Sequence, residues 1–204
     1  NESAGVTAVD SAGGHNATLT NGPTFIAGQF GNGIKLDGVN DYASVPHNAD
    51  FSLTSTFTLA SWMYLDNIPA VNKWYPAVYK GTSLLGLQDH NYLLAVTNGQ
   101  LDFEFMDLLG LRKVFVGGTV SKTKRWYHLA ATFDDAANSV KLYIDGTLVL
   151  SATTTAAPRT NLGNVWLGGN PYGDYTKGQI DDVRIYSRVL SAAEITTLVT
   201  GGEP

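Results

Sequence analysis

The fold is decided by three apolar runs, which read Trp126-Tyr-His-Leu-Ala-Ala-Thr-Phe-Asp134, Ser139-Val-Lys-Leu-Tyr-Ile144 and Thr147-Leu-Val-Leu-Ser-Ala-Thr153. Each run has the length of a β-strand and is rich in β-branched and aromatic residues. The pair Asp145-Gly146 separates the last two runs and tolerates the positive φ angles of a type I′ turn. The stretch therefore predicts three strands, the last two joined in a tight hairpin.

Runs of the same kind recur along the rest of the chain. Asn98-Gly99 separates two of them and predicts a second hairpin. Phe57–Leu65 has large apolar groups on both alternation faces, which predicts a central strand covered on both sides. About a dozen such runs predict an all-β, two-sheet sandwich. The other runs span Gly33–Leu36, Tyr42–Val45, Ala77–Lys80, Tyr92–Val96, Gln100–Phe105, Val114–Gly117, Val165–Gly168 and Gln179–Tyr186.

The composition argues against several classes of function. The formal net charge is −5 and the 13 Lys and Arg are spread along the chain, whereas a nucleic-acid partner needs clustered cations. The absence of Cys excludes disulfides and thiol catalysis. No apolar run approaches the roughly 20 residues that span a bilayer, so we expect no membrane insertion.

Residues 1–200 are expected to form one domain, because a chain of 204 residues that is 44% hydrophobic can bury a substantial core. Near its end, Ser191-Ala-Ala-Glu194 matches a capping box, in which the serine oxygen and the glutamate carboxylate each accept a backbone N–H. This motif predicts a short helix. Residues 201–204, Gly-Gly-Glu-Pro, have the composition of a linker, and we expect them to start one.

Three stretches together carry a resemblance to a known family. They are Gly31–Tyr42, Arg125–Gly146 and Gly178–Tyr186. In this order they resemble the laminin-G-like, concanavalin A-like lectin and glucanase domains, over nearly the whole chain. The resemblance implies an antiparallel jelly-roll β-sandwich with a short C-terminal helix. Similar domains are appended to secreted bacterial glycosidases and lyases and to adhesion proteins, which implies a secreted or cell-surface location in bacteria.

One acidic stretch, Leu101-Asp-Phe-Glu-Phe-Met-Asp107, raises the question of catalysis. Asp102 and Glu104 share one face of the expected strand, and a retaining glycosidase needs two carboxylates about 5 to 5.5 Å apart. The alternative is an amphipathic strand with its acids in solvent and its aromatics in the core. We favour that alternative, because the Glu-x-Asp-x-x-Glu order of glucanase relatives is replaced by Asp-x-Glu-x-x-Asp. No catalytic residue is therefore predicted.

Calcium is the cofactor that the sequence favours, since Ca²⁺ takes roughly six to eight oxygen ligands from loops rich in carboxylates and amides. The resemblance implies a structural Ca²⁺ held by an acid at the start of the last strand, which is Asp181. Asp10, Asp41 and the Gly38 carbonyl are its expected companions. The alternative is that these acids only form turns with their own backbone.

Three segments combine aromatic residues with amides and carboxylates, a mixture that recognises sugars by stacking and hydrogen bonding. We expect them to be loops that gather over one face, although each aromatic could instead pack beneath its own loop. The candidate carbohydrate-binding residues are Trp74 and Tyr75, then His90, Asn91 and Tyr92, and finally Tyr172, Asp174 and Tyr175.

These observations predict a non-catalytic, lectin-like module that binds a polysaccharide or oligosaccharide and belongs to a larger protein. We expect a monomer whose partners are a glycan and the other domains of its parent protein. Two other classes stay open. One is a polysaccharide-degrading glycosidase or lyase that uses Asp102, Glu104 or Asp107, and the other is an adhesion domain that binds protein.

Overall fold

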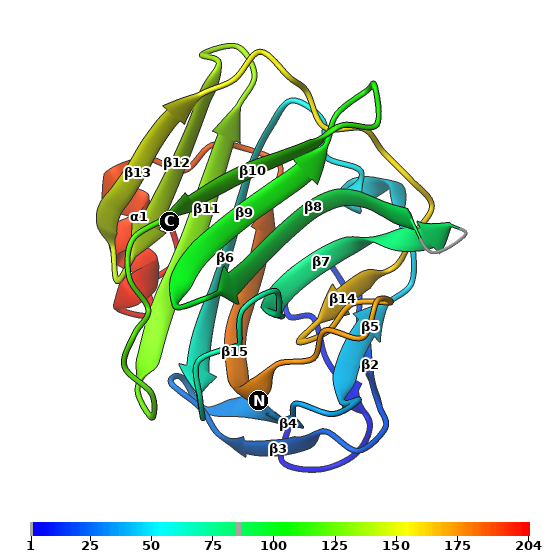
Figure 1. Cartoon of the computed structure of the whole chain (residues 1–204). Coiled ribbons are helices and arrows are strands. Elements are labelled where there is room, and N and C mark those ends of the chain that lie inside the picture. Colours follow the sequence, from blue (N-terminus) through cyan, green and yellow to red (C-terminus); the bar gives the residue numbers. More distant parts are fainter. Residues whose placement is uncertain (1, 85–86) are drawn as a thin grey trace.

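Two antiparallel sheets form a sandwich in the computed structural model, which describes residues 2–84 and 87–204 (Figure 1). Among the described residues, sheet A has eight strands and sheet B has seven. In spatial order, sheet A consists of β1 (Thr7–Ala8), β2 (Ala17–Thr20), β5 (Tyr42–Val45), β14 (Val165–Leu167), β7 (Trp74–Leu84), β8 (Leu87–Thr97), β9 (Gln100–Met106) and β10 (Arg112–Gly117).

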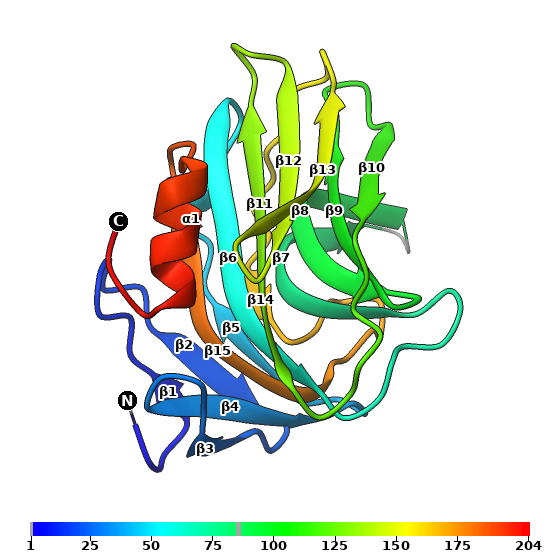
Figure 2. The same ribbon diagram turned by 90° about the vertical axis from the view of Figure 1, so that its left-hand side faces the viewer.

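Sheet B packs face to face against sheet A, and the turned view in Figure 2 shows the two layers side by side. The expected all-β sandwich is confirmed. In spatial order, sheet B consists of β13 (Thr147–Thr153), β12 (Ser139–Ile144), β11 (Trp126–Asp134), β6 (Thr56–Leu65), β15 (Lys177–Tyr186), β4 (Asn32–Asp37) and β3 (Thr24–Ala27).

The core between the sheets is filled by alternate residues of the long strands. Phe57 of β6 lies 5.4 Å from Phe133 of β11 and 6.0 Å from Phe103 of β9, measured between ring centroids. All three rings are fully buried. Such aromatic side chains bury large apolar areas, so this cluster holds the two sheets together.

Strand β6 occupies the centre of sheet B, as its two apolar faces predict. Its outer face packs against helix α1 (Ala192–Val199), which lies over sheet B in Figure 2. The predicted capping box is present, because Ser191 accepts from the Glu194 amide and Glu194 accepts from the Ser191 amide. The helix buries Ile195 and Leu198 against Ala60 of β6.

Both predicted hairpins are present with the expected backbone geometry. Asn98 and Gly99 have φ angles of 46° and 72° between β8 and β9, and Asp145 and Gly146 have 51° and 77° between β12 and β13. Positive φ at both central residues is the signature of a type I′ turn.

Strands β1 to β3 have no counterpart in the runs predicted from the sequence. Each has two to four residues, which is too short for a period-2 pattern to stand out. The segments that contain Trp74 and Tyr75, and His90 to Tyr92, were expected to be loops. This is wrong, because the first belongs to β7 and the second to β8. Polar residues occur within β8 because neighbouring segments cover both of its faces.

Candidate functional site

The outer face of sheet A, the face away from sheet B, carries its own layer of apolar side chains. Val78 and Leu94 point into the core, whereas Tyr79, Leu93 and Ala95 form a separate cluster on the outer face. This cluster is buried although it lies outside the sandwich. Three partly exposed aromatic side chains pack over it: Trp74, Trp166 and Tyr172.

The acidic pair of β9 lies on the same outer face. Asp102 and Glu104 are each 1% exposed, so the expectation that they face solvent is wrong. Glu104 accepts hydrogen bonds from Arg112 Nε at 2.6 Å and from Nη2 at 2.5 Å. Asp102 Oδ2 accepts from Trp74 Nε1 at 2.8 Å, and the Arg112 guanidinium lies 5.3 Å from the Trp74 ring centroid. Trp74 and Arg112 thus cover and pair the two carboxylates.

The electrostatics of this polar cluster separate the two acids. Burial, followed by the nearby Glu104 charge, raises the pKa of Asp102 to about 8. Asp102 is therefore protonated at neutral pH, while Glu104 is paired with Arg112 through two hydrogen bonds. Burial lowers the pKa of His90 to about 4, although its Nε2 lies 3.6 Å from Glu104 Oε2. His90 is therefore neutral, and the cluster is held by one ion pair.

A row of aromatic rings crosses another part of sheet A. Tyr42 of β5 stacks on Trp166 of β14 with ring centroids 4.3 Å apart, and on Tyr175 with centroids 6.4 Å apart. The interplanar angle is 28° in both pairs, and all three side chains are partly exposed. Nearly parallel, accessible rings are suited to stacking against the apolar face of another flat group.

Most of the candidate carbohydrate-binding residues that the sequence singled out lie on or beneath this face. Trp74 and His90 belong to the polar cluster, and Tyr175 belongs to the aromatic row. Tyr172 packs on Tyr79 and its hydroxyl donates to the Thr82 carbonyl at 2.5 Å, so it mainly fixes its own loop. Asp174 holds the same loop through Asn170 Nδ2 at 3.0 Å and lies 3.8 Å from Lys73 Nζ.

Three of the predicted sugar-binding residues face elsewhere. Tyr92 is fully buried in the core between the sheets, where no ligand on the outer face can reach it. The buried Asn91 amide donates to the carbonyls of Leu53 and Arg159 and therefore braces two loops. Tyr75 packs against the core, and its hydroxyl donates to Asn67 Oδ1 at 3.2 Å. Their roles in the structure are packing and loop anchoring.

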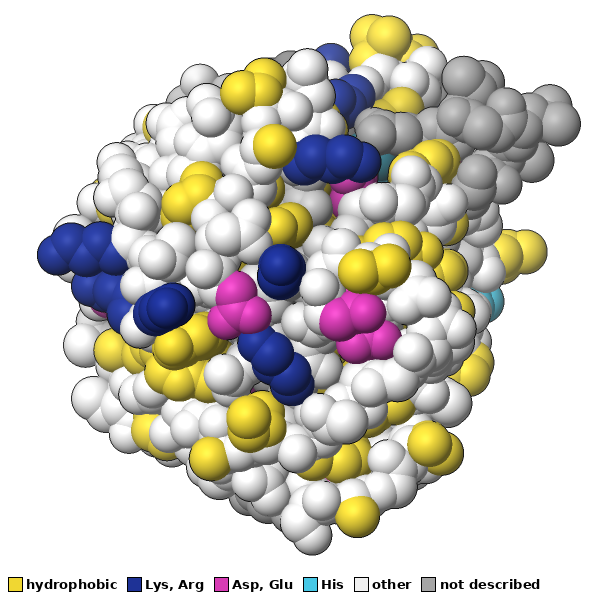
Figure 3. Space-filling view, turned by 60° about the horizontal axis from the view of Figure 1, so that its bottom comes forward, with side chains coloured by type: hydrophobic (Ala, Val, Ile, Leu, Met, Phe, Trp, Pro, Cys, Tyr) yellow, Lys and Arg dark blue, Asp and Glu magenta, His cyan; other side chains and the backbone are white. Residues whose placement is uncertain are grey.

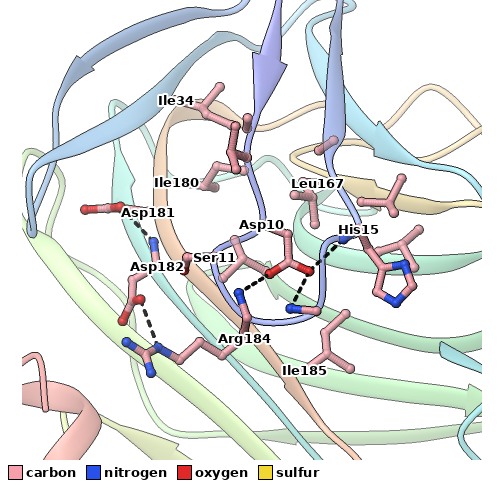
Figure 4. Close-up of a pocket in the computed structure, with 18 of the residues that line it drawn as sticks. Asp10, Ser11, His15, Ile34, Leu167, Ile180, Asp181, Asp182, Arg184 and Ile185 are labelled. Atoms are coloured by element: carbon pink, nitrogen blue, oxygen red, sulfur yellow. Dashed lines mark hydrogen bonds and ion pairs between the residues drawn. The ribbon is translucent and has the colours of Figure 1, made fainter. Parts of the chain in front are cut away.

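The four predicted calcium ligands do not form one cluster. Gly38 and Asp41 lie in the β4–β5 turn, where Asp41 accepts from the Asp37 amide at 3.1 Å. Asp10 and Asp181 line a hollow between the sheets, and neither turn residue does (Figure 4). Within the described ranges, no three His, Asp or Glu side chains gather closely enough to hold a metal.

Asp10 and Asp181 differ in how well they suit a cation. The Asp10 carboxylate accepts the amides of Ala12, Gly13 and His15, and these bonds lower its pKa despite the opposing effect of burial. Burial instead raises the pKa of Asp181, even though it accepts the amides of Phe30 and Asp182. No Lys, Arg or His of the described chain pairs with Asp181. The two carboxylates therefore differ in that three amides hold Asp10, whereas burial dominates at Asp181.

Sequence reasoning missed Tyr42, Trp166 and Arg112 as parts of the candidate surface. Tyr42 and Trp166 were recognised only as strand residues. The alternation of Val165, which is buried, with Trp166, which is partly exposed, carries the signal that Trp166 faces outward. No pattern along the chain links Arg112 to Glu104, because their contact depends on the β9–β10 register.

The charge on one face of the molecule is mixed. On the face shown in Figure 3, Lys and Arg side chains alternate with Asp and Glu side chains, and neither sign forms an extended patch. A polyanion such as nucleic acid needs a continuous basic surface, so this face does not suit one.

The two sheets and the covered outer face define a jelly-roll β-sandwich. The chain belongs to the concanavalin A-like lectin/glucanases superfamily, whose family model matches residues 37–196. A sequence search among curated proteins finds no match. No helix in the described part of the chain is long and apolar enough to cross a membrane.

Solved structures share the fold at low sequence identity. The binding domain of Paraclostridial Mosquitocidal Protein 1 has a TM-score of 0.74 and 17% identity, over 96% of this chain and 51% of that one. Domain 4 of AbnA, a GH43 extracellular arabinanase from Geobacillus stearothermophilus solved with arabinotriose, has a TM-score of 0.71 and 21% identity, over 93% and 91%. The botulinum neurotoxin serotype D ligand binding domain, solved with N-acetylneuraminic acid, has a TM-score of 0.71 and 19% identity, over 95% of this chain and 48% of that one. The chain thus spans about half of each toxin domain and most of the arabinanase domain.

Proposed function

We propose that the protein is a non-catalytic carbohydrate-binding module of a larger extracellular protein, and that the outer face of sheet A binds the glycan. The observation that carries this proposal is the partly exposed aromatic row of Tyr42, Trp166 and Tyr175 on the same face as Trp74 and Arg112. The rings can stack on the apolar face of a pyranose or furanose, and the guanidinium can donate to hydroxyl or carboxylate groups.

The similar structures support this proposal and suggest which sugars to test. One is a domain of an extracellular arabinanase in complex with arabinotriose, and another is a toxin domain in complex with N-acetylneuraminic acid. The arabinanase acts outside the cell, which supports an extracellular location for this chain. Arabinan and sialylated oligosaccharides are therefore the first members of a test panel.

The state of the acids supports the non-catalytic half of the proposal. A glycosidase needs one carboxylate free to attack or to activate water and one that delivers a proton. Both Glu104 oxygens are bound by Arg112. Asp107 accepts the amides of Leu109 and Leu111 and lies 3.0 Å from Lys113 Nζ, so it stabilises the β9–β10 turn.

Affinity electrophoresis of the domain in gels that contain each polysaccharide tests binding, and an assay for new reducing ends in the same mixtures tests hydrolysis. We expect retardation by at least one polysaccharide and no new reducing ends. Reducing ends would make the protein an enzyme. The absence of retardation across the panel would favour the adhesion alternative.

Two tryptophan substitutions test whether the glycan binds on the outer face of sheet A. Trp166→Ala removes the centre of the aromatic row, and we expect it to weaken glycan binding at least tenfold, since stacking of a flat group on one ring is worth about 1–3 kcal/mol. The matched control is Trp126→Ala, because Trp126 is also partly exposed but packs on Tyr64 in sheet B. Equal losses in the two variants would contradict the assignment to sheet A.

We also propose that a structural Ca²⁺ binds at Asp181. Its support is the buried carboxylate without a cationic partner in the described chain, together with the ligand position implied by the family resemblance. Asp10, Gly38 and Asp41 are not part of this narrower proposal.

A further inference from the structure

The turn between β9 and β10 presents leucine side chains to solvent. Leu108, Leu109 and Leu111 are 72%, 84% and 54% exposed. A single exposed leucine is ordinary, but three within four positions form an apolar tip. In Figure 1 this turn projects beyond the ends of both strands. We call residues 108–111 the leucine turn.

Hydrogen bonds fix the backbone of the leucine turn. Asp107 Oδ1 accepts the amides of Leu109 at 2.9 Å and Leu111 at 2.8 Å. The Asp107 amide donates to the Leu111 carbonyl, and the Gly110 amide donates to the Asp107 carbonyl, each at 2.9 Å. The turn therefore holds its leucines outward instead of letting them fold back onto the protein. Apolar surface kept in water costs free energy, and a partner that covers it recovers that cost.

Three cations surround the base of the leucine turn. Arg112 and Lys113 follow directly after Leu111. Arg159 Nη1 lies 3.3 Å from the position that a Cβ on Gly110 would take. We call these three side chains the basic collar. Each is paired with an acid: Arg112 with Glu104 at 2.5 Å, Lys113 with Asp107 at 3.0 Å and Arg159 with Asp89 at 2.6 Å.

All three ion pairs point their cation toward solvent. The cationic side chains are 35%, 30% and 34% exposed, whereas their acids, in the same order, are 1%, 8% and 17% exposed. Within the described chain, Nη1 of Arg112 and of Arg159 makes no hydrogen bond, so both guanidiniums keep donors for an anion. An anionic surface that approaches the turn therefore meets the cation of each pair before the acid.

We propose that the leucine turn inserts into the surface of an anionic lipid bilayer, where the basic collar contacts the headgroup phosphates. Shallow anchoring of this kind combines buried apolar area with attraction to anionic lipids. The expectation of no membrane insertion was drawn from the length that spans a bilayer, and a turn that buries only its tip needs no such length. The proposal does not depend on glycan binding.

The shape of the tip favours a lipid surface over a protein partner. A stable protein interface buries roughly 800 Å² on each partner around a well-packed centre, and three leucine side chains cover less than that. A fluid bilayer needs no matching pocket, since its acyl chains adapt to the side chains that enter. The narrow apolar tip with cations at its base fits the boundary between acyl chains and anionic headgroups.

Flotation of the protein with lipid vesicles tests the proposal. One set of vesicles contains phosphatidylcholine alone and the other contains equal parts of phosphatidylcholine and phosphatidylglycerol. We expect binding at least tenfold tighter to the anionic set, weakened by added salt, which screens the collar. An excess of soluble glycerol phosphate should not displace the protein, because it offers no hydrocarbon to the leucines. Binding to neither set, equal binding to both, or displacement by glycerol phosphate would overturn the proposal.

Surface variants locate the contact. Leu109→Ser should weaken vesicle binding about tenfold, a change that full burial of one leucine can supply. The matched control is Leu148→Ser, because Leu148 is also exposed but lies on β13 in sheet B. Lys113→Gln should reduce the preference for phosphatidylglycerol, whereas Lys122→Gln, an exposed cation outside the collar, should not. Parent-like vesicle binding by a folded Leu109→Ser protein would refute the role of the turn.

A fluorescent probe on the turn measures insertion directly. The chain has no Cys, so Leu109→Cys offers one site for a polarity-sensitive dye, and Leu148→Cys is its control. Anionic vesicles should shift the emission of the dye at position 109 to the blue, and lipids brominated on their acyl chains should quench it. A dye at 109 that stays in water while the protein is bound would contradict insertion. Sedimentation without lipid covers the protein alternative, since a dimer that Leu109→Ser abolishes would assign the tip to a second copy and overturn the proposal.

Discussion

Replacing Asp102 by Asn tests the electrostatics of the polar cluster. A protonated Asp102 accepts from Trp74 and can share its proton with Glu104, and the carboxamide of the Asp102→Asn variant can make the same contacts. The variant should therefore match the parent protein below about pH 4, where Asp102 is protonated in both the folded and the unfolded state. At higher pH the two should diverge, because only the parent protein carries a group there that must lose a proton in a buried site.

The sign and size of the divergence follow from the shifted pKa. Asp102 has a pKa of about 8 in the folded protein and about 3.9 in the unfolded chain, so the folded state binds the proton more tightly. The stabilisation is complete below about pH 4 and is lost as the pH rises through about 8. Between pH 7 and pH 9 the loss is about 1 kcal/mol, which corresponds to a Tm lowered by about 2–4 °C for a domain of this size.

Thermal unfolding of both proteins at pH 7, 8 and 9 measures this difference. Burial also lowers the pKa of Lys80 to about 8, but Lys80 is present in both proteins and cancels in the comparison. Asp135→Asn is the matched control, since it makes the same substitution at a partly exposed position of the β11–β12 turn. If the Asp102→Asn and parent curves run parallel from pH 7 to 9, Asp102 is ionised throughout and the reasoning is refuted.

Three further outcomes are expected. Arg112→Met should destabilise the fold by about 2 kcal/mol in urea unfolding, because it leaves the buried Glu104 charge unpaired; an unchanged midpoint would contradict the ion pair. Gly163→Ala should lower the free energy of unfolding by about 2 kcal/mol or more, since a Cβ there would lie 2.1 Å from the Gly81 backbone. A Cβ at Gly173 would meet no atom within 4 Å, so Gly173→Ala should lower it by only about 1 kcal/mol. Calcium should raise the Tm, EDTA should reverse this rise, and Asp181→Asn should abolish it. A Tm that changes with neither calcium nor EDTA would contradict the proposed calcium site.

Much of the fold could be predicted because its signals are local. The Asn98-Gly99 and Asp145-Gly146 turns, the capping box at Ser191 and the two-faced apolar run of β6 each depend on neighbours within a few residues. The short strands β1 to β3 could not be predicted, because two to four residues take their extended form from the strand they pair with.

The candidate site was only partly predictable. The sequence identified Trp74, His90 and Tyr175, but it placed Tyr92 beside them because polar neighbours suggested a loop. The side of a strand on which a residue lies depends on bulges, such as the register shift between Lys80 and Gly81 opposite His90 and Tyr92. A shift of this kind moves a side chain from one face to the other and leaves no mark in composition.

The sequence by itself determined that this chain is a β-sandwich of the concanavalin A-like class, with its central strand, two hairpins and closing helix, since those depend on periodicity and turn chemistry. Tertiary structure alone decided that Asp102 and Glu104 are buried beneath Trp74 and Arg112, and that Tyr42 stacks on Trp166. The contacts of Trp74 with Asp102 and of Tyr42 with Trp166 bring together segments distant in the chain. Their contacts are fixed by sheet register and by the packing of loops over sheet A, and both arise only when the whole chain has folded.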